Sequence, residues 1–347
     1  MLIKKQKIPF VKMLMIGILP SFLKKALYRL KGYEIGKGVK IGPGSVIIGK
    51  QVKIRDGVKI GLASVVRADE IQIDRFATIG SFTFIDTGKL KIGEDARINE
   101  QVIVGGMKRP ESALTLGART IIMEYSFINT TCSVSIGDDS GIGGHCLLFT
   151  HGSWLNQLEG FPVNFAPIHI GNSVWLPWRV FVMPGVTIGD EVVIGANSLI
   201  SKSIASNSLV AGSPAKVLRS EYPQKLDSAQ KEKLFRESIQ DFIQHLEHYH
   251  VAIEVVEQES EIRITGKTQP GFQIIFCFGK LKLDTFSDTK EAIVVYNITS
   301  LENEFPLPMK QAMQLDITNK TRKGTSAAGE ELVKFLGRYG LRLKRLD

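Results

Sequence analysis

The chain has 347 residues, enough for more than one domain with a substantial core, and it carries 44 Lys and Arg against 35 Asp and Glu. The formal net charge of +9 is local: residues 1–32 contain eight Lys or Arg and no acidic residue, which leaves +1 for the rest. The three cysteines, Cys132, Cys146 and Cys277, are an odd number without metal-ligand spacing. This pattern argues against a disulfide framework and favours a reducing compartment and small buried apolar side chains.

Residues 1–32 are also rich in apolar side chains, but Lys12 and Pro20 interrupt the apolar run. The run falls short of the roughly 20 residues that a membrane-spanning helix needs, and no small-residue cleavage site follows it. Two compatible interpretations remain: short helices that cap the open end of the following domain, or an amphipathic anchor drawn to anionic lipid. Nucleic-acid binding is disfavoured, because the basic residues alternate with aliphatic ones and no nucleic-acid motif is present.

A bulky aliphatic residue, closely followed by Gly, recurs every six positions across residues 35–211. The repeat is clearest at Ile170-Gly171 and Ile188-Gly189. This period predicts a parallel β-helix, in which three hexads make a coil of about 18 residues and coils stack about 4.8 Å apart. We expect the aliphatic residue to point inward and the Gly, Asp or Asn that follows it to turn the chain. Residues 33–222 then form about eight to ten stacked coils, whereas a β-sandwich would alternate with period two.

One long insertion interrupts the repeat. After Leu148 the chain reads Phe149-Thr150-His151-Gly152-Ser153-Trp154, and the repeat resumes only at Ile168. Loops that leave a rigid scaffold are common places for functional residues. His151 lies at the root of this loop, where the coil would hold its ring in a fixed orientation. It is therefore the leading candidate for a chemical role.

The repeat ends after Ala211, and residues 223–347 are predicted to form a separate small α+β domain with no assigned role. Apolar residues at helical spacing predict a helix over 228–250, and a second helix is expected over 329–338. Strands are expected over 251–256, 261–265, 272–278 and 291–298. Three clustered histidines are interpreted as solvated surface residues rather than as a metal site: His245, His248 and His250.

Several segments, taken in order, resemble the hexapeptide-repeat acyltransferases, particularly the galactoside, maltose and xenobiotic O-acetyltransferases. The resemblance covers residues 33–222 as a fold and residues 148–219 with specific motif agreement. Each motif is weak alone, but the ordered set is specific. The motifs are Thr150-His151 with the loop that follows, then Pro167–Trp175, Pro184–Asp190, Val193–Ser198, Ser201-Lys202 and Ala211–Arg219.

The resemblance implies a left-handed parallel β-helix that assembles as a homotrimer, with coenzyme A stretched along a groove between neighbouring prisms. Flat prism faces favour such closed cyclic packing. His151 matches the family's catalytic base, which takes the acceptor hydroxyl proton as the oxygen attacks the thioester of acetyl-CoA. A histidine with its ordinary pKa of about 6.5 suits this role near neutral pH. Backbone N–H groups would stabilise the oxyanion, and no metal is expected.

The family's cofactor positions fall on one aromatic, two small and three cationic residues: Trp178, Ala196, Ser201, Lys202, Lys216 and Arg219. A small residue lets the pantetheine arm approach the backbone, and the cations suit the phosphates of the cofactor. Trp175 and Asn129 match substrate-side positions of the family. Pro177 and Trp178 depart from the Gly and small residue that usually follow the family Trp, which alters the expected cofactor path there.

These observations predict a cytoplasmic, CoA-dependent O-acyltransferase that acetylates a sugar of a surface-polysaccharide or glycolipid precursor. The basic segment 1–32 would bring the enzyme to a lipid-linked acceptor at the inner face of an anionic membrane. Two alternatives stay open: N-acetylation of a nucleotide-linked amino sugar, and a non-catalytic, membrane-associated β-helix scaffold. Zinc-dependent hydration, suggested by His145, His151 and the stretch Val66–Asp69, is disfavoured because the coil at Phe84–Asp86 carries no His.

Overall fold

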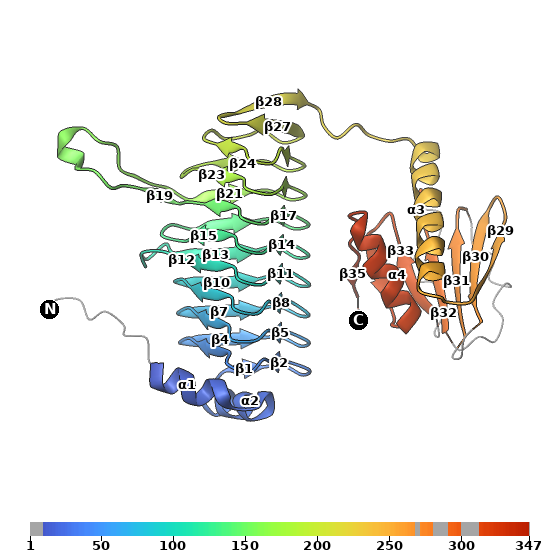
Figure 1. The fold of residues 1–347 in the computed structure, drawn as a ribbon, viewed down its shortest axis with the longest axis horizontal. Helices are drawn as coiled ribbons and strands as arrows, with labels where there is room; N and C mark the ends of the chain where they lie inside the picture. Colours follow the sequence, from blue (N-terminus) through green and yellow to red (C-terminus); the bar gives the residue numbers. More distant parts are fainter. Residues whose placement is uncertain (1–9, 268–270, 280–290, 300–311, 347) are drawn as a thin grey trace. The chain divides into compact units, whose positions relative to one another are not determined.

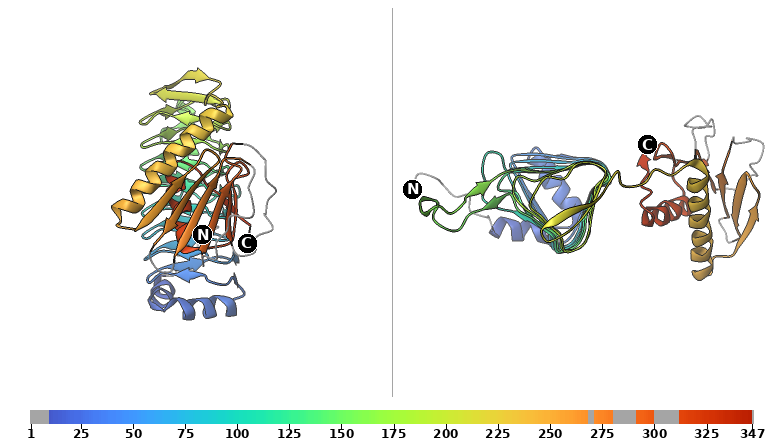
Figure 2. Two further views of the ribbon diagram at one scale, coloured as in Figure 1. Left: turned by 90° about the vertical axis from the view of Figure 1, so that its right-hand side faces the viewer. Right: turned by 90° about the horizontal axis from the view of Figure 1, so that it is seen from above.

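The computed structural model describes residues 10–267, 271–279, 291–299 and 312–346. The chain divides into two compact units, residues 1–224 and 225–347. In the first unit, short strands form three sheets that run along a stack of coils, as Figure 1 shows, and the strands pair in parallel except for the last pair of one sheet. Seen along the stack in Figure 2, these coils enclose a narrow interior. The predicted parallel β-helix is therefore confirmed.

Each coil contributes one strand to each sheet. Sheet A contains β1 (Glu34–Ile35), β4 (Gln51–Ile54), β7 (Glu70–Ile73), β10 (Lys89–Ile92), β13 (Ala113–Leu116), β16 (Val134–Ile136), β21 (Ile168–Ile170) and β24 (Thr187–Ile188). Sheet B contains β2 (Lys40–Ile41), β5 (Lys59–Ile60), β8 (Thr78–Ile79), β11 (Arg97–Ile98), β14 (Ile121–Ile122), β17 (Gly141–Ile142), β22 (Trp175–Leu176), β25 (Val193–Ile194), β27 (Ser208–Gly212) and β28 (Ala215–Ser220). Sheet C contains β3 (Val46–Ile48), β6 (Val65–Arg67), β9 (Phe84–Asp86), β12 (Ile103–Gly105), β15 (Phe127–Asn129), β18 (Leu147–Leu148), β23 (Phe181–Val182) and β26 (Leu199–Ile200).

Aliphatic side chains of equivalent strands stack inside the prism. In sheet A, for example, Ile54, Ile73 and Ile92 lie above one another with at most 2 % of each side chain exposed. Burying one such side chain contributes about 1.5–3 kcal/mol, so a single coil gains too little and many coils must stack. The coil length varies more than the six-residue repeat suggests. Paired residues are 19 apart between β4 and β7, but 18 apart between β21 and β24.

The glycines of the repeat have a different role from the expected one. At Gly137 and Gly171 the backbone is not left-handed; instead, the next coil occupies the space where a side chain would begin. A Cβ on Gly137 would lie 2.6 Å from Asn172 Oδ1. The left-handed corner positions are held by other residue types, such as Asp139 and Ser173. The repeat therefore selects Gly for close approach of the next coil rather than for turning the chain.

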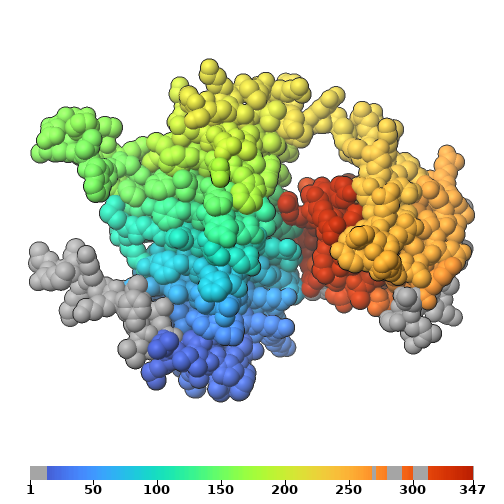
Figure 3. Space-filling view, viewed as in Figure 1, coloured from blue at the N-terminus to red at the C-terminus, as the bar shows by residue number. Residues whose placement is uncertain are grey.

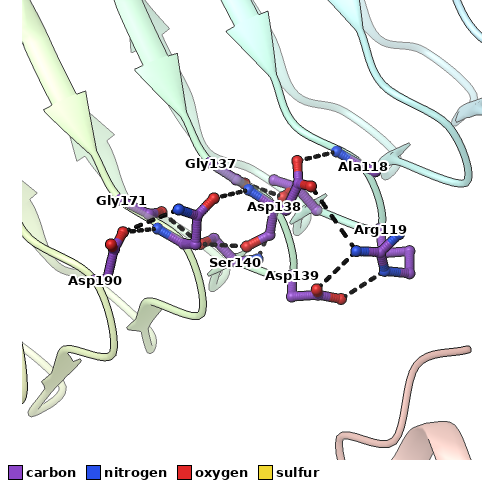
Figure 4. Close-up of polar contacts among 10 residues, drawn as sticks. Ala118, Arg119, Gly137, Asp138, Asp139, Ser140, Gly171 and Asp190 are labelled. Atoms are coloured by element: carbon purple, nitrogen blue, oxygen red, sulfur yellow. Dashed lines mark hydrogen bonds and ion pairs between the residues drawn. The ribbon is translucent and has the colours of Figure 1, made fainter. Parts of the chain in front are cut away.

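The side chains that fill this space form a ladder along the corner between sheets A and B (Figure 4). Asp190 Oδ1 accepts a hydrogen bond from the Asn172 backbone N–H at 2.6 Å, and Asn172 Oδ1 accepts one from the Asp138 N–H at 2.8 Å. One coil further, Asp138 Oδ1 accepts from the Ala118 N–H at 2.8 Å. Each corner thus satisfies backbone donors that strand pairing leaves free.

Replacing Gly171 by Ala is expected to destabilise the first unit by about 1–3 kcal/mol, because the added Cβ would lie 2.8 Å from the Asp190 backbone N and closer still to its Oδ1. Thermal or urea unfolding followed by circular dichroism measures the change. Gly152→Ala is the matched control, since among the described residues no heavy atom lies within 4 Å of a Cβ built there. Equal stability of the two variants would contradict this role for Gly171.

Two helices, α1 (Phe10–Ile18) and α2 (Ser21–Leu30), cover the N-terminal end of the coil stack (Figure 1). The first coil begins the stack, so its downward-facing backbone groups need partners from outside the sheets. On its inner face α2 supplies a hydroxyl and an ammonium group. Tyr28 Oη accepts from the Ile47 N–H at 2.9 Å, and Lys24 Nζ donates to the carbonyl oxygens of Gly42 and Ser45 at 2.7 and 3.0 Å.

Flanking residues complete this cap. The Ser21 hydroxyl accepts from the Ile41 N–H at 3.0 Å, and the Arg29 guanidinium donates to the Ile35 carbonyl at 2.8 Å. These contacts confirm the capping interpretation of the N-terminal segment. None of the helices within the described residues combines the length and apolar character needed to cross a bilayer.

Within its described residues, the second unit contains one mixed sheet and two helices, α3 (Ser228–His248) and α4 (Ala327–Arg338). The strands, in sheet order, are β29 (Ile253–Glu257), β30 (Glu261–Gly266), β31 (Phe272–Cys277), β32 (Glu291–Tyr296), β33 (Ala312–Asp316), β34 (Thr321–Lys323) and β35 (Lys344–Arg345). The first four strands and both helices lie close to their predicted ranges, whereas the last three strands were not predicted. A capping box between Asp227 and Gln230 fixes the start of α3.

The prediction of solvated histidines is wrong for His245. Its side chain is 13 % exposed and contacts the rings of Phe242, Phe335 and Tyr249. His248 and His250 are exposed, as expected. The three cysteines are free and buried, in agreement with their interpretation as small apolar side chains.

Candidate active site

His151 stands where the chain leaves the prism between sheets C and A. It begins β19 (His151–Gly152), which pairs with β20 (Asn164–Phe165) to form the base of an antiparallel hairpin. The hairpin projects from the side of the first unit in Figures 1 and 3 and carries a short 3-10 helix, η1 (Gln157–Glu159). The ring of His151 is half-buried. The predicted position at the loop root is thus observed.

The imidazole is held from below by the preceding coil. His151 Nδ1 lies 3.2 Å from Asn129 Oδ1 and 3.4 Å from Thr131 Oγ1. Asn129 Oδ1 also accepts hydrogen bonds from the Thr131 backbone N–H at 3.1 Å and the Thr150 hydroxyl at 3.0 Å. Since the Thr131 N–H requires an acceptor, it identifies this atom as the amide oxygen. Because Nδ1 of His151 faces this oxygen, the geometry assigns a proton to Nδ1, and in the neutral form of the ring Nε2 is then the acceptor nitrogen.

Aromatic side chains fix the plane of the imidazole. Phe165, paired with His151 across the hairpin, stacks on its ring at a centroid distance of 5.8 Å and an interplanar angle of 13°. The ring of Phe149 also lies beside the imidazole, at a centroid distance of 6.3 Å, and packs in turn against Phe181 of β23. These contacts and the Asn129 hydrogen bond orient the ring from different directions. A histidine ring held in one orientation is suited to proton transfer.

A second, shorter insertion lies beside this site and was not identified from the sequence. Strands β10 and β13 pair with an offset of 24 residues, because residues 106–112 leave the coil between sheets C and A. The Met107 N–H donates to Thr131 Oγ1 at 3.1 Å. The Arg109 guanidinium lies over the Phe165 ring, 4.8 Å from its centroid. The insertion thus contacts Thr131, which lies next to Nδ1 of His151, and Phe165, which stacks on the ring of His151.

Charged side chains line the coil corner beneath the insertion. Lys108 Nζ lies 2.7 Å from Asp86 Oδ1, and Arg67 approaches the other oxygen of Asp86 at 3.4 Å. Arg109 Nε pairs with Glu111 at 2.7 Å. With three cations and two carboxylates, this group carries one net positive charge. The only available sequence signal for it was the wider spacing between aliphatic residues at Val104 and Leu114.

Asn129 is not placed as an open substrate contact. Only 3 % of it is exposed, and its amide oxygen serves the three donors named above. Trp175 lies on β22 in sheet B, away from the His151 corner, and its ring covers Gly141. The structure therefore separates these two residues, which were predicted together on the substrate side.

The predicted cofactor residues lie along two edges of the prism and on its terminal hairpin. Ser201 and Lys202 follow β26 at the corner between sheets C and A, the same edge as His151. Trp178 and Ala196 lie one coil apart on the corner between sheets B and C. Lys216 and Arg219 lie on β28, in the terminal hairpin with β27. All six are exposed, and a single chain does not gather them around His151.

Two other histidines of the first unit lie apart from this site. His145 stacks on Tyr125 at 5.0 Å and contacts Trp178 at 5.5 Å, at the corner between sheets B and C. His169 points outward from sheet A, with Nδ1 2.8 Å from Ser135 Oγ. Within the part of the chain that the structure describes, no three His, Cys, Asp or Glu side chains are grouped as a metal site.

Comparison with known proteins agrees with this architecture. Residues 167–202 match the family model "Bacterial transferase hexapeptide (six repeats)". The chain is 35% identical over 130 residues to the putative colanic acid biosynthesis acetyltransferase WcaF of Escherichia coli (strain K12), covering 36% of this chain and 69% of that protein. It is 39% identical over 103 residues to the galactoside O-acetyltransferase of the same strain, covering 29% and 47%.

Among solved structures, a hexapeptide-repeat-containing acetyltransferase of Vibrio cholerae O1 biovar eltor, complexed with acetyl coenzyme A, aligns with a TM-score of 0.27 and 20% identity. That alignment covers 61% of this chain and 85% of the other. The identity to WcaF extends over more than two thirds of that relative. The chain therefore belongs to the hexapeptide-repeat acetyltransferases.

Proposed function

We propose that this protein transfers an acetyl group from acetyl-CoA to a hydroxyl group of a sugar, with His151 as general base. The observation that supports this most strongly is the hydrogen bond between His151 Nδ1 and Asn129 Oδ1. It orients Nε2 as a proton acceptor on a half-buried ring at the edge of the prism. Asn129 then acts as a positioning residue, which selects the tautomer that the reaction needs.

The chemistry follows from this tautomer. Nε2 of His151 takes the proton of the acceptor hydroxyl while the hydroxyl oxygen attacks the thioester carbonyl carbon. The C–S bond then breaks, and the imidazolium returns its proton to the departing thiolate. The products are an acetyl ester and the free thiol of coenzyme A. A thiolate leaves readily, so no stronger acid than the imidazolium is required.

We propose a homotrimer in which the cofactor lies between neighbouring chains. In one chain, Trp178 and Ala196 occupy a different edge from His151, and both are exposed. Cyclic packing of flat prism faces would bring different edges of two chains together. Exposed Lys202, Lys216 and Arg219 have the charge needed to pair with the phosphates of coenzyme A, which supports their proposed role.

The acceptor is proposed to be a sugar of a surface-polysaccharide or glycolipid precursor. The names of the relatives refer to colanic acid biosynthesis and to galactoside, which supports a carbohydrate acceptor. Beside His151, the Arg109 guanidinium over the Phe165 ring offers hydrogen-bond donors suited to sugar hydroxyl groups. Residues 1–32 have the charge expected of a protein that works in the cytoplasm on lipid-linked acceptors at an anionic membrane face.

The test is acetyl-CoA-dependent acetylation of a panel of nucleotide sugars, oligosaccharides and glycolipids by the full-length protein. Thiol release gives the rate, and mass spectrometry of the product identifies the acetylated group. We expect acceptor-dependent thiol release and an ester that mild alkali removes. An alkali-stable amide would instead establish N-acetylation. Failure of the protein to bind acetyl-CoA in calorimetry would overturn the proposal and favour a non-catalytic scaffold.

A further inference from the structure

Helix α2 has its apolar face on the outside. Phe22, Leu23, Leu27 and Leu30 are 64, 40, 44 and 85 % exposed, and with Ala26 they form one continuous stripe at helical spacing. The opposite face holds Lys24 and Tyr28, both buried, because these side chains hydrogen-bond the first coil. An ordinary surface helix buries its apolar stripe against the core. In α2 the capping role has reversed this arrangement.

Helix α1, at the same end of the coil stack, also exposes apolar side chains (Figure 1). Leu14, Met15 and Ile18 are 68, 66 and 74 % exposed, whereas Ile16 packs toward the core of the prism. Among the side chains that the structure describes, the two helices expose seven large apolar ones at the end of the first unit. Contiguous exposed apolar surface on a folded protein usually marks an interaction site. We refer to Leu14, Met15, Ile18, Phe22, Leu23, Leu27 and Leu30 as the end surface.

The charge around the end surface indicates what covers it. At 100° per residue, Lys25 and Arg29 border one side of the α2 stripe and Lys31 borders the other. Residues 1–32 as a whole carry eight cations and no anion. Two copies of such a surface would repel each other, which disfavours self-association through it. An apolar face flanked only by cations matches an anionic lipid bilayer.

We infer that the end surface binds the protein to anionic membranes, with α1 and α2 lying in the lipid interface. The apolar side chains enter the boundary between headgroups and acyl chains, and the flanking cations contact the headgroups. The same two helices thus serve two purposes: their inner polar face completes the first coil, and their outer apolar face binds lipid. This binding does not depend on the acetyltransferase reaction.

Vesicle flotation with the full-length protein tests this inference. We expect the protein to float with vesicles of phosphatidylcholine mixed with phosphatidylglycerol, and at least about tenfold less with phosphatidylcholine alone. Added salt should weaken binding, because it screens the headgroup charge. Equal partitioning onto both vesicle types would overturn the proposed role of charge.

Matched variants distinguish vesicle binding through the end surface from nonspecific binding by other exposed parts of the protein. Leu27→Ser/Leu30→Ser should lower binding to the anionic vesicles by at least about tenfold, whereas Val255→Ser/Val256→Ser, on an exposed strand of the second unit, should not. Lys25→Glu should weaken binding, and Lys231→Glu, with the same change in net charge, should not. Circular dichroism should show unchanged folding, since these side chains are exposed or half-buried.

Two results would contradict the inference. One is undiminished vesicle binding by Leu27→Ser/Leu30→Ser. The other is a change in oligomeric state of that variant, measured by light scattering, with vesicle binding unchanged. The second result would show that the end surface lies between copies of this chain.

Discussion

Replacement of His151 by Ala is expected to lower kcat/KM for acetyl transfer by about 10²–10⁴-fold, the range that a positioned general base contributes. The variant loses the only group that the proposed reaction uses to move a proton. Because thiol release reports the reaction directly, the loss is measured with the acceptor identified from the panel. Calorimetric affinity for coenzyme A should change little, which separates loss of chemistry from loss of binding.

The control for this variant is His169→Ala, which removes an imidazole from the outer surface of sheet A. It should retain nearly full activity. The activity of Asn129→Leu should lie between those of His151→Ala and His169→Ala. We expect a lower kcat and little change in KM, because the ring of His151 loses the acceptor that fixes Nδ1–H. Retention of activity within a few-fold by His151→Ala would refute its role as the base.

The β-helix was predictable because its core repeats at a fixed short period. Equivalent positions in successive coils carry the same type of aliphatic residue, so the repeat remains recognisable even where a single position departs from it. The reason for Gly at the corners could not be obtained in this way. It depends on which atom of the next coil lies above, such as Asn172 Oδ1 above Gly137, and that register is a tertiary property.

The candidate site shows the same limit. His151 was found because a long insertion marks it in the sequence. Its partner Asn129 lies 22 positions earlier, one coil below, and the hydrogen bond between them exists only through stacking. The insertion at residues 106–112 was overlooked because it lengthens one coil by only a few residues between two aliphatic positions. The contact of Arg109 with Phe165 joins the two insertions and could not be inferred from either alone.

For helix α2, the periodicity of the sequence shows an apolar face but does not show whether that face is buried or exposed. Its apolar stripe is evident from the residues, and such a stripe normally predicts the buried face. Here the buried face is chosen by hydrogen-bond demand from the first coil, so Lys24 lies inside and Leu27 outside. The strands β33 and β34 were missed for a related reason, since buried Gln314, Asp316 and Arg322 interrupt their apolar pattern.

Replacement of Lys24 by Met is expected to destabilise the first unit by about 2–4 kcal/mol, because the carbonyl oxygens of Gly42 and Ser45 lose a charged donor in a buried place. For a unit of this size, the thermal midpoint should fall by roughly 5–15 °C. Lys25→Met is the matched control, since it removes a neighbouring half-buried ammonium and should cost less than about 0.5 kcal/mol. If the thermal midpoint of Lys24→Met lay within about 2 °C of that of the parent protein, as is expected for the Lys25→Met control, the capping role would be contradicted.

The pH dependence of the same comparison tests the state of the buried ammonium. Burial lowers the pKa of Lys24 from its ordinary value of 10.5. Between the lowered pKa and 10.5 the unfolded chain therefore binds more protons at this residue than the folded chain, and folding becomes more favourable as pH rises. The stability difference between the parent protein and Lys24→Met should accordingly widen as the pH approaches 10.5. A difference that narrows with rising pH would mean that the charge itself, rather than the two hydrogen bonds, holds the cap in place.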